Sequence, residues 1–165
     1  MISSKTTICW SPKISRLFLS PALFYLQTRT DSLTQALKNR YPDFAVVLLT
    51  NQGKNPKAPH TWERSVLLTG QQKPIIYART QCQKIPHFGP WSFLHAQGTR
   101  PLGERLFHQA TITRSQVTHS KIPGRHSLIK HLNLPNKLYG IRKTIFYHHN
   151  KPIELIEIFL NLTKP

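Results

Sequence analysis

The sequence predicts an α+β fold in which an antiparallel sheet carries helices on one face. Runs of β-prone residues outnumber the helical segments, and most of them follow one another through short polar turns. Such connections suit antiparallel strands, whereas parallel strands need long crossovers. A length of 165 residues with 39% hydrophobic content suits one domain with a sizeable core. We therefore expect a single domain over residues 1–165, with residues 1–15 as a poorly ordered leader.

Four helical segments are expected. Ser20 and Pro21 provide an N-cap and a first-turn proline for one helix, and a second begins at Thr30 or Asp31 and contains SLTQALKNR. A short helix is expected at residues 91–97. Pro101 is placed to begin another helix, ERLFHQ. Together these segments supply the helical layer.

Strands are expected at residues 44–50, 65–69, 75–78 (or 75–85 if the second arm of the hairpin continues), 111–117, 139–148 and 153–162. The expected turns are at 70–74 and 149–152, and residues 51–60 form a loop rich in polar and Gly/Pro residues. The segment 118–136 is basic and broken by Gly and Pro, which predicts a helical lid or a flexible excursion.

The chain is strongly basic. It has 23 Lys and Arg against 6 Asp and Glu, a formal net charge of +17, which attracts either nucleic acid or a carboxylate-rich metabolite. The cations are dispersed along the chain, which weakens the nucleic-acid interpretation. Cys9 and Cys82 show no metal-ligand spacing, so we expect no metal, no disulfide and a reducing, cytoplasmic compartment. The apolar run at 17–26 is too short to span a bilayer.

Two arginines stand in a predicted β-hairpin, WERSVLLTGQQKPIIYART at residues 62–80. In a hairpin closed by an even-numbered loop, opposed residues have an odd sum of residue numbers, and Arg64 and Arg79 satisfy that parity. The two guanidiniums would then share a mostly apolar face and require an acid or an anionic ligand. The alternative is that both reach a sheet edge as solvated charges.

Glu157 is an acid within an apolar row of the last strand. Alternation places it on one face with Ile153, Leu155 and Phe159. An acid there is costly unless it is paired or functional, and a structural ion pair is the alternative. Together with Arg64 and Arg79, Glu157 indicates a small enclosed pocket for an anion, with a titratable group beside it.

Several motifs occur in a characteristic order: LSPALFYLQTRTDSLT, WERSVLL, YART, TRPLGERLF, TITR, LYGIRK and NKPIELIEIFL. Their order and spacing resemble the chorismate lyase family of ubiquinone biosynthesis, from about residue 19 to residue 162. The resemblance implies an antiparallel sheet of about six strands, with helices on one face and two helical flaps over a buried site. It also implies conversion of chorismate to 4-hydroxybenzoate and pyruvate without a metal or an organic cofactor.

The resemblance also implies the site residues. Arg64 in WERSVLL matches the arginine that holds the ring carboxylate, and Arg79 in YART matches the arginine near the enolpyruvyl carboxylate. Glu157 in LIEIFL matches the acid near the ring oxygen. Leu33 in DSLT and Leu102 in RPLG match positions whose backbone N–H groups bind the ligand carboxylate, although RPLG is also an ordinary helix-start turn.

Two departures and three alternatives accompany this hypothesis. Ala78 replaces a glycine common before the second arginine, and segment 118–136 is longer and more basic than in enterobacterial enzymes. The alternatives are a chorismate-binding relative without turnover, a ligand-sensing domain of the same fold, and a basic nucleic-acid-binding protein. We expect a monomer that acts on small molecules, without a nucleic-acid partner or membrane insertion.

Overall fold

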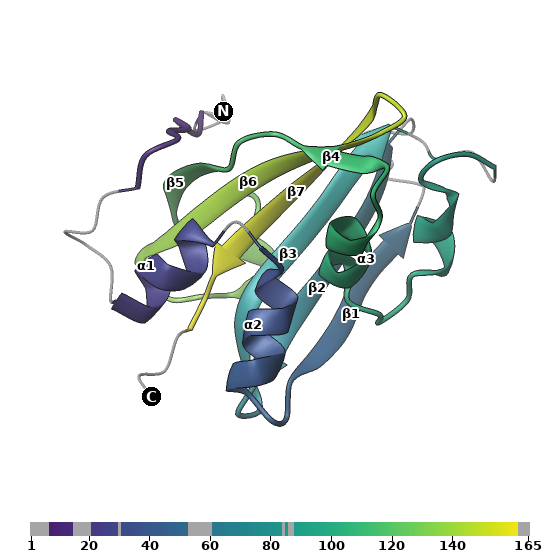
Figure 1. The fold of residues 1–165 in the computed structure, drawn as a ribbon. Helices are drawn as coiled ribbons and strands as arrows, with labels where there is room; N and C mark the ends of the chain where they lie inside the picture. The colour runs from purple at the N-terminus through teal and green to yellow at the C-terminus, as the bar shows by residue number, and fades with distance from the viewer. Residues whose placement is uncertain are drawn as a thin grey trace.

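A computed structural model describes residues 7–14, 21–29, 31–52, 61–83, 85 and 88–161. Figure 1 shows one curved sheet with helices packed against it. The elements, in chain order, are α1 (Pro21–Thr28), α2 (Leu33–Arg40), β1 (Ala45–Gln52), β2 (Thr61–Gly70), β3 (Lys73–Gln83), the 3₁₀ helix η2 (Ser92–Ala96), α3 (Leu102–His108), β4 (Ile112–Arg114), β5 (Thr118–Pro123), the 3₁₀ helix η3 (Lys130–Leu132), β6 (Leu138–His148) and β7 (Lys151–Phe159).

The predicted antiparallel α+β fold is confirmed. The described strands form one seven-stranded sheet in the order β1-β2-β3-β7-β6-β4, and β5 pairs with β6. Each pair of neighbouring strands among them is antiparallel. The sheet has one strand more than expected because β4 and β5 lie along different halves of the same edge of β6.

The expected elements differ from the observed ones mainly at their ends. The second helix begins after Ser32, whose side chain accepts a hydrogen bond from the backbone N–H of Gln35, instead of after Thr30 or Asp31. The segment at 91–97 is the 3₁₀ helix η2, and the strand expected at 111–117 is the shorter β4. Ser20 and residues 53–60 of the expected loop lie outside the described residues.

The two hairpin turns contain two residues each. Gln71 and Gln72 connect β2 to β3 with φ angles of 50° and 56°, and His149 and Asn150 connect β6 to β7 with 48° and 59°. The first turn receives support from outside the hairpin. Both oxygens of the Asp43 carboxylate accept backbone N–H groups, from Gln71 at 2.8 Å and Gln72 at 2.9 Å. These hydrogen bonds hold the pKa of Asp43 below its usual value.

Helices α1, α2 and α3 cover one face of the sheet, which we call the helical face (Figure 1). Leu26 of α1 and Leu33 and Leu37 of α2 pack with sheet residues of one buried cluster. Leu102 and Leu106 of α3 pack in a second cluster on the same face. Burial of these apolar side chains fixes the helices against the sheet and encloses the space between them.

Segment 118–136 packs against the opposite face. Ile122, Ile129 and Leu132 join a cluster with Tyr77 and Ile158 of the sheet, and the His131 ring meets Tyr77 edge-on with centroids 5.4 Å apart. The expected lid over the site is therefore wrong. The apolar residues of the segment, which are interspersed with its basic residues, instead complete the core on the face opposite α1, α2 and α3.

Residues 7–14 also contribute to this opposite face. Ile8 and Trp10 pack against the same cluster, and Ser11 exchanges two backbone hydrogen bonds with His119 of β5, at 2.9 and 2.7 Å. This packing differs from the poorly ordered leader expected at residues 1–15, of which residues 1–6 and 15 lie outside the described part. Within the described ranges, no helix combines the length and apolar character needed to cross a membrane.

Candidate active site

Two neighbouring cross-strand rows on the helical face form the floor of a pocket. Because side chains alternate along a strand, residues two apart point to the same face. The first row runs across β2, β3, β7 and β6 as Arg64, Thr80, Leu155 and Thr144. The next row is Val66, Ala78, Glu157 and Arg142. All eight residues line the pocket, so the floor is apolar in its middle and charged at its ends.

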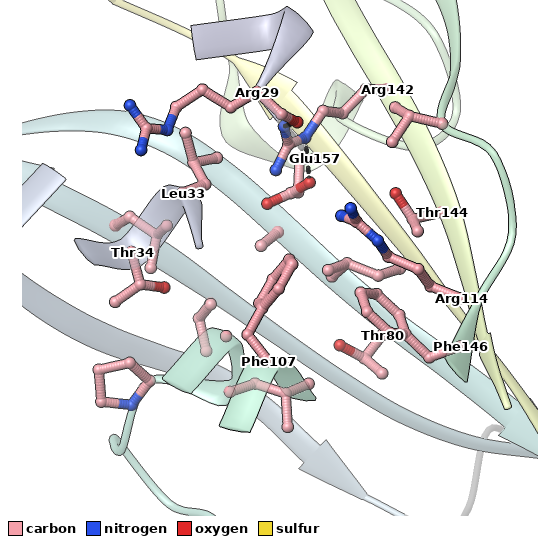
Figure 2. Close-up of a pocket in the computed structure, with 18 of the residues that line it drawn as sticks. Arg29, Leu33, Thr34, Thr80, Phe107, Arg114, Arg142, Thr144, Phe146 and Glu157 are labelled. Atoms are coloured by element: carbon pink, nitrogen blue, oxygen red, sulfur yellow. Dashed lines mark hydrogen bonds and ion pairs between the residues drawn. The ribbon is translucent and has the colours of Figure 1, made fainter. Parts of the chain in front are cut away.

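Helices α2 and α3 form the wall above this floor. Leu33 and Thr34 from α2 and Phe107 from α3 line the pocket, and Figure 2 shows the Phe107 side chain extending from α3 into it. The two helices approach closely at Gly103 of α3. Any larger residue there would place its Cβ only 2.8 Å from Thr34 Oγ1 of α2. An ion pair between Lys38 and Glu104 also joins them. The wall is thus one packed unit.

Arg142 and Glu157 form a buried ion pair inside the pocket (Figure 2). The Arg142 Nε donates to Glu157 Oε2, and the two side chains are only 5% and 7% exposed. Arg142 Nη1 also donates to the carbonyl oxygens of Leu26 and Arg29, each at 3.2 Å. These bonds satisfy a charge that would otherwise be costly to bury, and they tie the end of α1 to the pocket.

Arg64 occupies the other end of the floor. Its Nη2 donates to the carbonyl oxygens of Gly98 at 2.8 Å and Arg100 at 3.1 Å, and its Nε donates to the Gly98 carbonyl at 3.3 Å. Within the described residues, no carboxylate neutralises it. Burial lowers the pKa of Arg64 to about 10, so the guanidinium stays charged at neutral pH. Arg64 is therefore a buried cation for which an anionic ligand would be the counter-ion.

The charged side chains of the pocket suit an anionic ligand as a set. Four arginines and two acids line it: Arg29, Arg64, Arg114, Arg142, Asp31 and Glu157. Arg29 pairs with Asp31, which is 64% exposed, and Arg142 pairs with Glu157. The formal excess of two positive charges matches a small molecule with two carboxylates.

The comparison with protein families covers nearly the whole chain. The sequence profile of the family described as chorismate lyase matches residues 5–165. The chain belongs to the chorismate lyase family.

A probable chorismate pyruvate-lyase of Thiobacillus denitrificans is 28% identical over 144 residues, which cover 78% of this chain and 77% of the relative. One of Shewanella amazonensis is 32% identical over 168 residues, 93% and 88% of the two chains. A chorismate pyruvate-lyase of Cronobacter sakazakii is 33% identical over 105 residues, 64% and 54%.

The structure brings together four of the five residues that the chorismate lyase resemblance implies. Arg64 and Glu157 lie on the floor, and Leu33 and Leu102 lie in the wall. Leu33 is the first residue of α2 and Leu102 the first of α3, where backbone N–H groups have no partner within the helix. Whether those N–H groups bind a ligand stays a prediction.

Arg79 does not line this pocket. It lies opposite Ser65 on β2, and its Nη2 donates to Glu63 Oε2 at 2.6 Å on the face away from the helices. The prediction that Arg64 and Arg79 share a face is wrong. A β-bulge between Leu68 and Thr69 shifts the register by one residue. Opposed residues next to the turn have an odd sum of residue numbers, whereas opposed residues beyond the bulge have an even sum. Arg64 consequently lies opposite Thr80.

Sequence reasoning missed Arg142 and Arg114. A detectable signal existed for Arg142. A two-residue turn at His149 and Asn150 places Arg142 directly opposite Glu157, and alternation along β6 puts Arg142 on the same face as Thr144. The sequence pattern instead predicts a four-residue turn at 149–152. Such a turn would place Thr144, two residues further along β6, opposite Glu157, so the pairing with Arg142 was not predicted. Arg114 gave no such signal, since three-residue β4 is too short for a clear alternation.

Proposed function

We propose that this chain is a chorismate pyruvate-lyase, which converts chorismate to 4-hydroxybenzoate and pyruvate in ubiquinone biosynthesis. The observation that carries the proposal is the placement of Arg64 and Glu157 on one face of the sheet, two strands and one row apart. Standard strand spacings put their Cα atoms roughly 12 Å apart. Because side chains stand roughly perpendicular to a sheet, their charged groups can lie a similar distance apart. That separation suits a six-membered ring with a carboxylate at one end and an oxygen at the other, with one hydrogen bond at each end.

Arg64 is the proposed partner of the ring carboxylate. Its guanidinium is held in place by the carbonyl oxygens of Gly98 and Arg100 and has no acid of its own within the described residues. A carboxylate there would gain charge-assisted hydrogen bonds without having to displace an ion pair. The ring would then extend over Ala78 and Thr80, whose short side chains leave room above β3.

Glu157 is the proposed acid–base residue at the oxygen end of the ring. The reaction breaks the bond between the ether oxygen and its ring carbon, and the adjacent carbinol carbon loses its proton as the ring becomes aromatic. The released enol takes up a proton at its methylene carbon and becomes pyruvate. Arg142 binds Glu157 Oε2, and Oε1 accepts no hydrogen bond from the described residues, so Oε1 is available for proton transfer.

The wall supports the same assignment. Leu33 and Leu102 place the first residues of α2 and α3 at the pocket, and their backbone N–H groups are proposed to donate to a ligand carboxylate. Positioning contributes most to such a reaction, because aromatisation supplies the driving force and no covalent intermediate is needed. We also propose that the protein acts as a cytoplasmic monomer without a metal or an organic cofactor, with Cys9 and Cys82 as free thiols.

The test is incubation of the purified protein with chorismate, followed by quantification of 4-hydroxybenzoate and pyruvate in the presence of a chelator. We expect the two products in equal amounts and an unchanged rate when EDTA is added. A folded protein that binds 4-hydroxybenzoate but releases neither product from chorismate would be a binding relative without turnover. That result would refute the enzymatic proposal. Inhibition by the chelator would refute independence from metals.

A further inference from the structure

Arg114 is a pocket-lining arginine whose charge has no acidic partner among the residues that the structure describes. Arg29 pairs with Asp31 and Arg142 with Glu157, while the Arg64 guanidinium is bound by two carbonyl oxygens. For Arg114 the described contact is an aromatic ring: its Cζ lies 5.2 Å from the centroid of Phe107. A cation beside a ligand pocket without a counter-ion is a candidate for ligand binding.

The position of Arg114 is fixed by the edge of the sheet. It lies opposite Phe146 of β6 in the register of β4, and Figure 2 shows its side chain extending from β4 into the pocket. The next residue, Ser115, holds β4 in place, because its N–H donates to the Ile145 carbonyl at 2.8 Å and its Oγ accepts from the Ile145 N–H at 3.0 Å. These two hydrogen bonds fix the position of β4 and therefore the position of the Arg114 backbone beside the pocket.

The substrate proposed above needs a second cation. Its enolpyruvyl ether is attached to the ring carbon next to the carbinol carbon that would face Glu157, so its carboxylate extends sideways along the strands. On one side, the pocket is lined by Leu33 and Leu68 and by Arg29, whose charge is already paired with Asp31. On the other side lie the Thr144 hydroxyl and the Arg114 guanidinium. Arg114 is an exposed residue at the rim of the pocket, and a carboxylate favours its unpaired guanidinium over the apolar side chains and the paired Arg29.

We propose that Arg114 binds the enolpyruvyl carboxylate and thereby acts as a specificity residue for chorismate over the aromatic product. The assignment rests on the proposed lyase function and takes the role that the resemblance gave to Arg79. The two arginines then bind different groups of the substrate. Arg64 holds the ring carboxylate that substrate and product share, and Arg114 holds the carboxylate that only the substrate carries.

The test uses Arg114→Met, which keeps an unbranched apolar stem over Phe107 and removes the charge. We expect kcat/KM for chorismate to fall about 10- to 100-fold, the usual cost of a lost charge-assisted hydrogen bond, while the Kd for 4-hydroxybenzoate stays within about twofold. Arg114→Lys should recover part of the loss.

The matched control is Arg105→Met. Arg105 is an exposed residue of α3 outside the pocket, and its Cζ lies 3.9 Å from the Phe93 centroid. It removes the same net charge and a similar ring contact, and kcat/KM should stay within about twofold.

The outcomes separate this proposal from the lyase function itself. An active wild type with an Arg114→Met variant of near-normal kcat/KM would overturn the role of Arg114, as would equal losses in the affinities for chorismate and 4-hydroxybenzoate. If the wild type proved inactive, the lyase proposal would fail. Titration calorimetry of both ligands with wild type and Arg114→Met would still decide whether Arg114 recognises the second carboxylate.

Discussion

Arg142 and Glu157 are directly opposed on β6 and β7, and the guanidinium of one donates to the carboxylate of the other in the interior of the pocket. Both side chains are almost completely buried. The pair therefore has two consequences: it holds a charged carboxylate where water is scarce, and it makes that carboxylate depend on a single cation. The carbonyl oxygens of Leu26 and Arg29 extend the same network to α1.

Removal of Arg142 should destabilise the fold. In Arg142→Met, the Glu157 carboxylate would be left buried without its partner, which costs about 3–5 kcal/mol of unfolding free energy. Urea denaturation measures this. Lys143→Met is the control, because Lys143 lies on the opposite face, with Nζ 4.5 Å from the centroid of Trp10, and should cost at most about 1 kcal/mol. The double variant Arg142→Met with Glu157→Leu should recover much of the loss. Equal losses for Arg142→Met and Lys143→Met would show that the buried pair contributes little.

Glu157→Gln should slow turnover more than it weakens product binding. The amide keeps the size of the side chain and removes its capacity to accept a proton, so kcat should fall roughly 10²- to 10⁴-fold. Glu154→Gln is the control, since Glu154 lies on the same strand and the opposite face, and its kcat should stay close to that of wild type. Thermal unfolding of both variants accompanies the kinetics. A folded Glu157→Gln protein with kcat within a few-fold of wild type would refute the acid–base role and leave positioning as the source of catalysis.

Arg64→Met should weaken binding of 4-hydroxybenzoate, which retains the ring carboxylate. The loss of one charge-assisted partner costs about 1.5–3 kcal/mol, or roughly 10- to 150-fold in Kd. Arg79→Met is the informative comparison. Because Arg79 pairs with Glu63 on the opposite face, this variant should leave the Kd for 4-hydroxybenzoate unchanged. Calorimetric titration of both variants decides between the two arginines, and a larger loss in Arg79→Met would contradict the register of β2 against β3.

Cys82 should resist alkylation near neutral pH. Burial raises the pKa of its thiol to about 12, compared with an ordinary value of 9.0, because the thiolate is poorly solvated. At pH 8 the thiolate fraction is then roughly 1000-fold smaller than for an ordinary thiol, and the reaction rate should keep rising with pH up to about 12. Iodoacetamide labelling with peptide mass spectrometry should show modification of exposed Cys9 long before Cys82. Comparable rates at pH 8 would contradict the burial of Cys82.

Local sequence determined most of the elements, although not β5, and the faces of two site residues. Arg64 lies with Val66 and Leu68 in the pocket, and Glu157 lies with Leu155, because strict alternation holds wherever a strand is uninterrupted. The helix starts near Pro21 and Pro101 likewise follow from residues within one helical turn. Information of this kind is contained in a few neighbouring residues.

Tertiary structure decided which of these residues meet. The bulge between Leu68 and Thr69 moved Arg79 to the other face. Pro74 lies beside it on β3 and is a residue type found at bulges, but the shift itself depends on how β2 and β3 pair. Segment 118–136 covers the opposite face because apolar residues such as Ile129 bury against a cluster assembled from distant strands. The approach of Arg114 to Phe107 joins β4 to α3 across the pocket. Such contacts depend on the relative placement of whole elements, which the pattern within any one element does not specify.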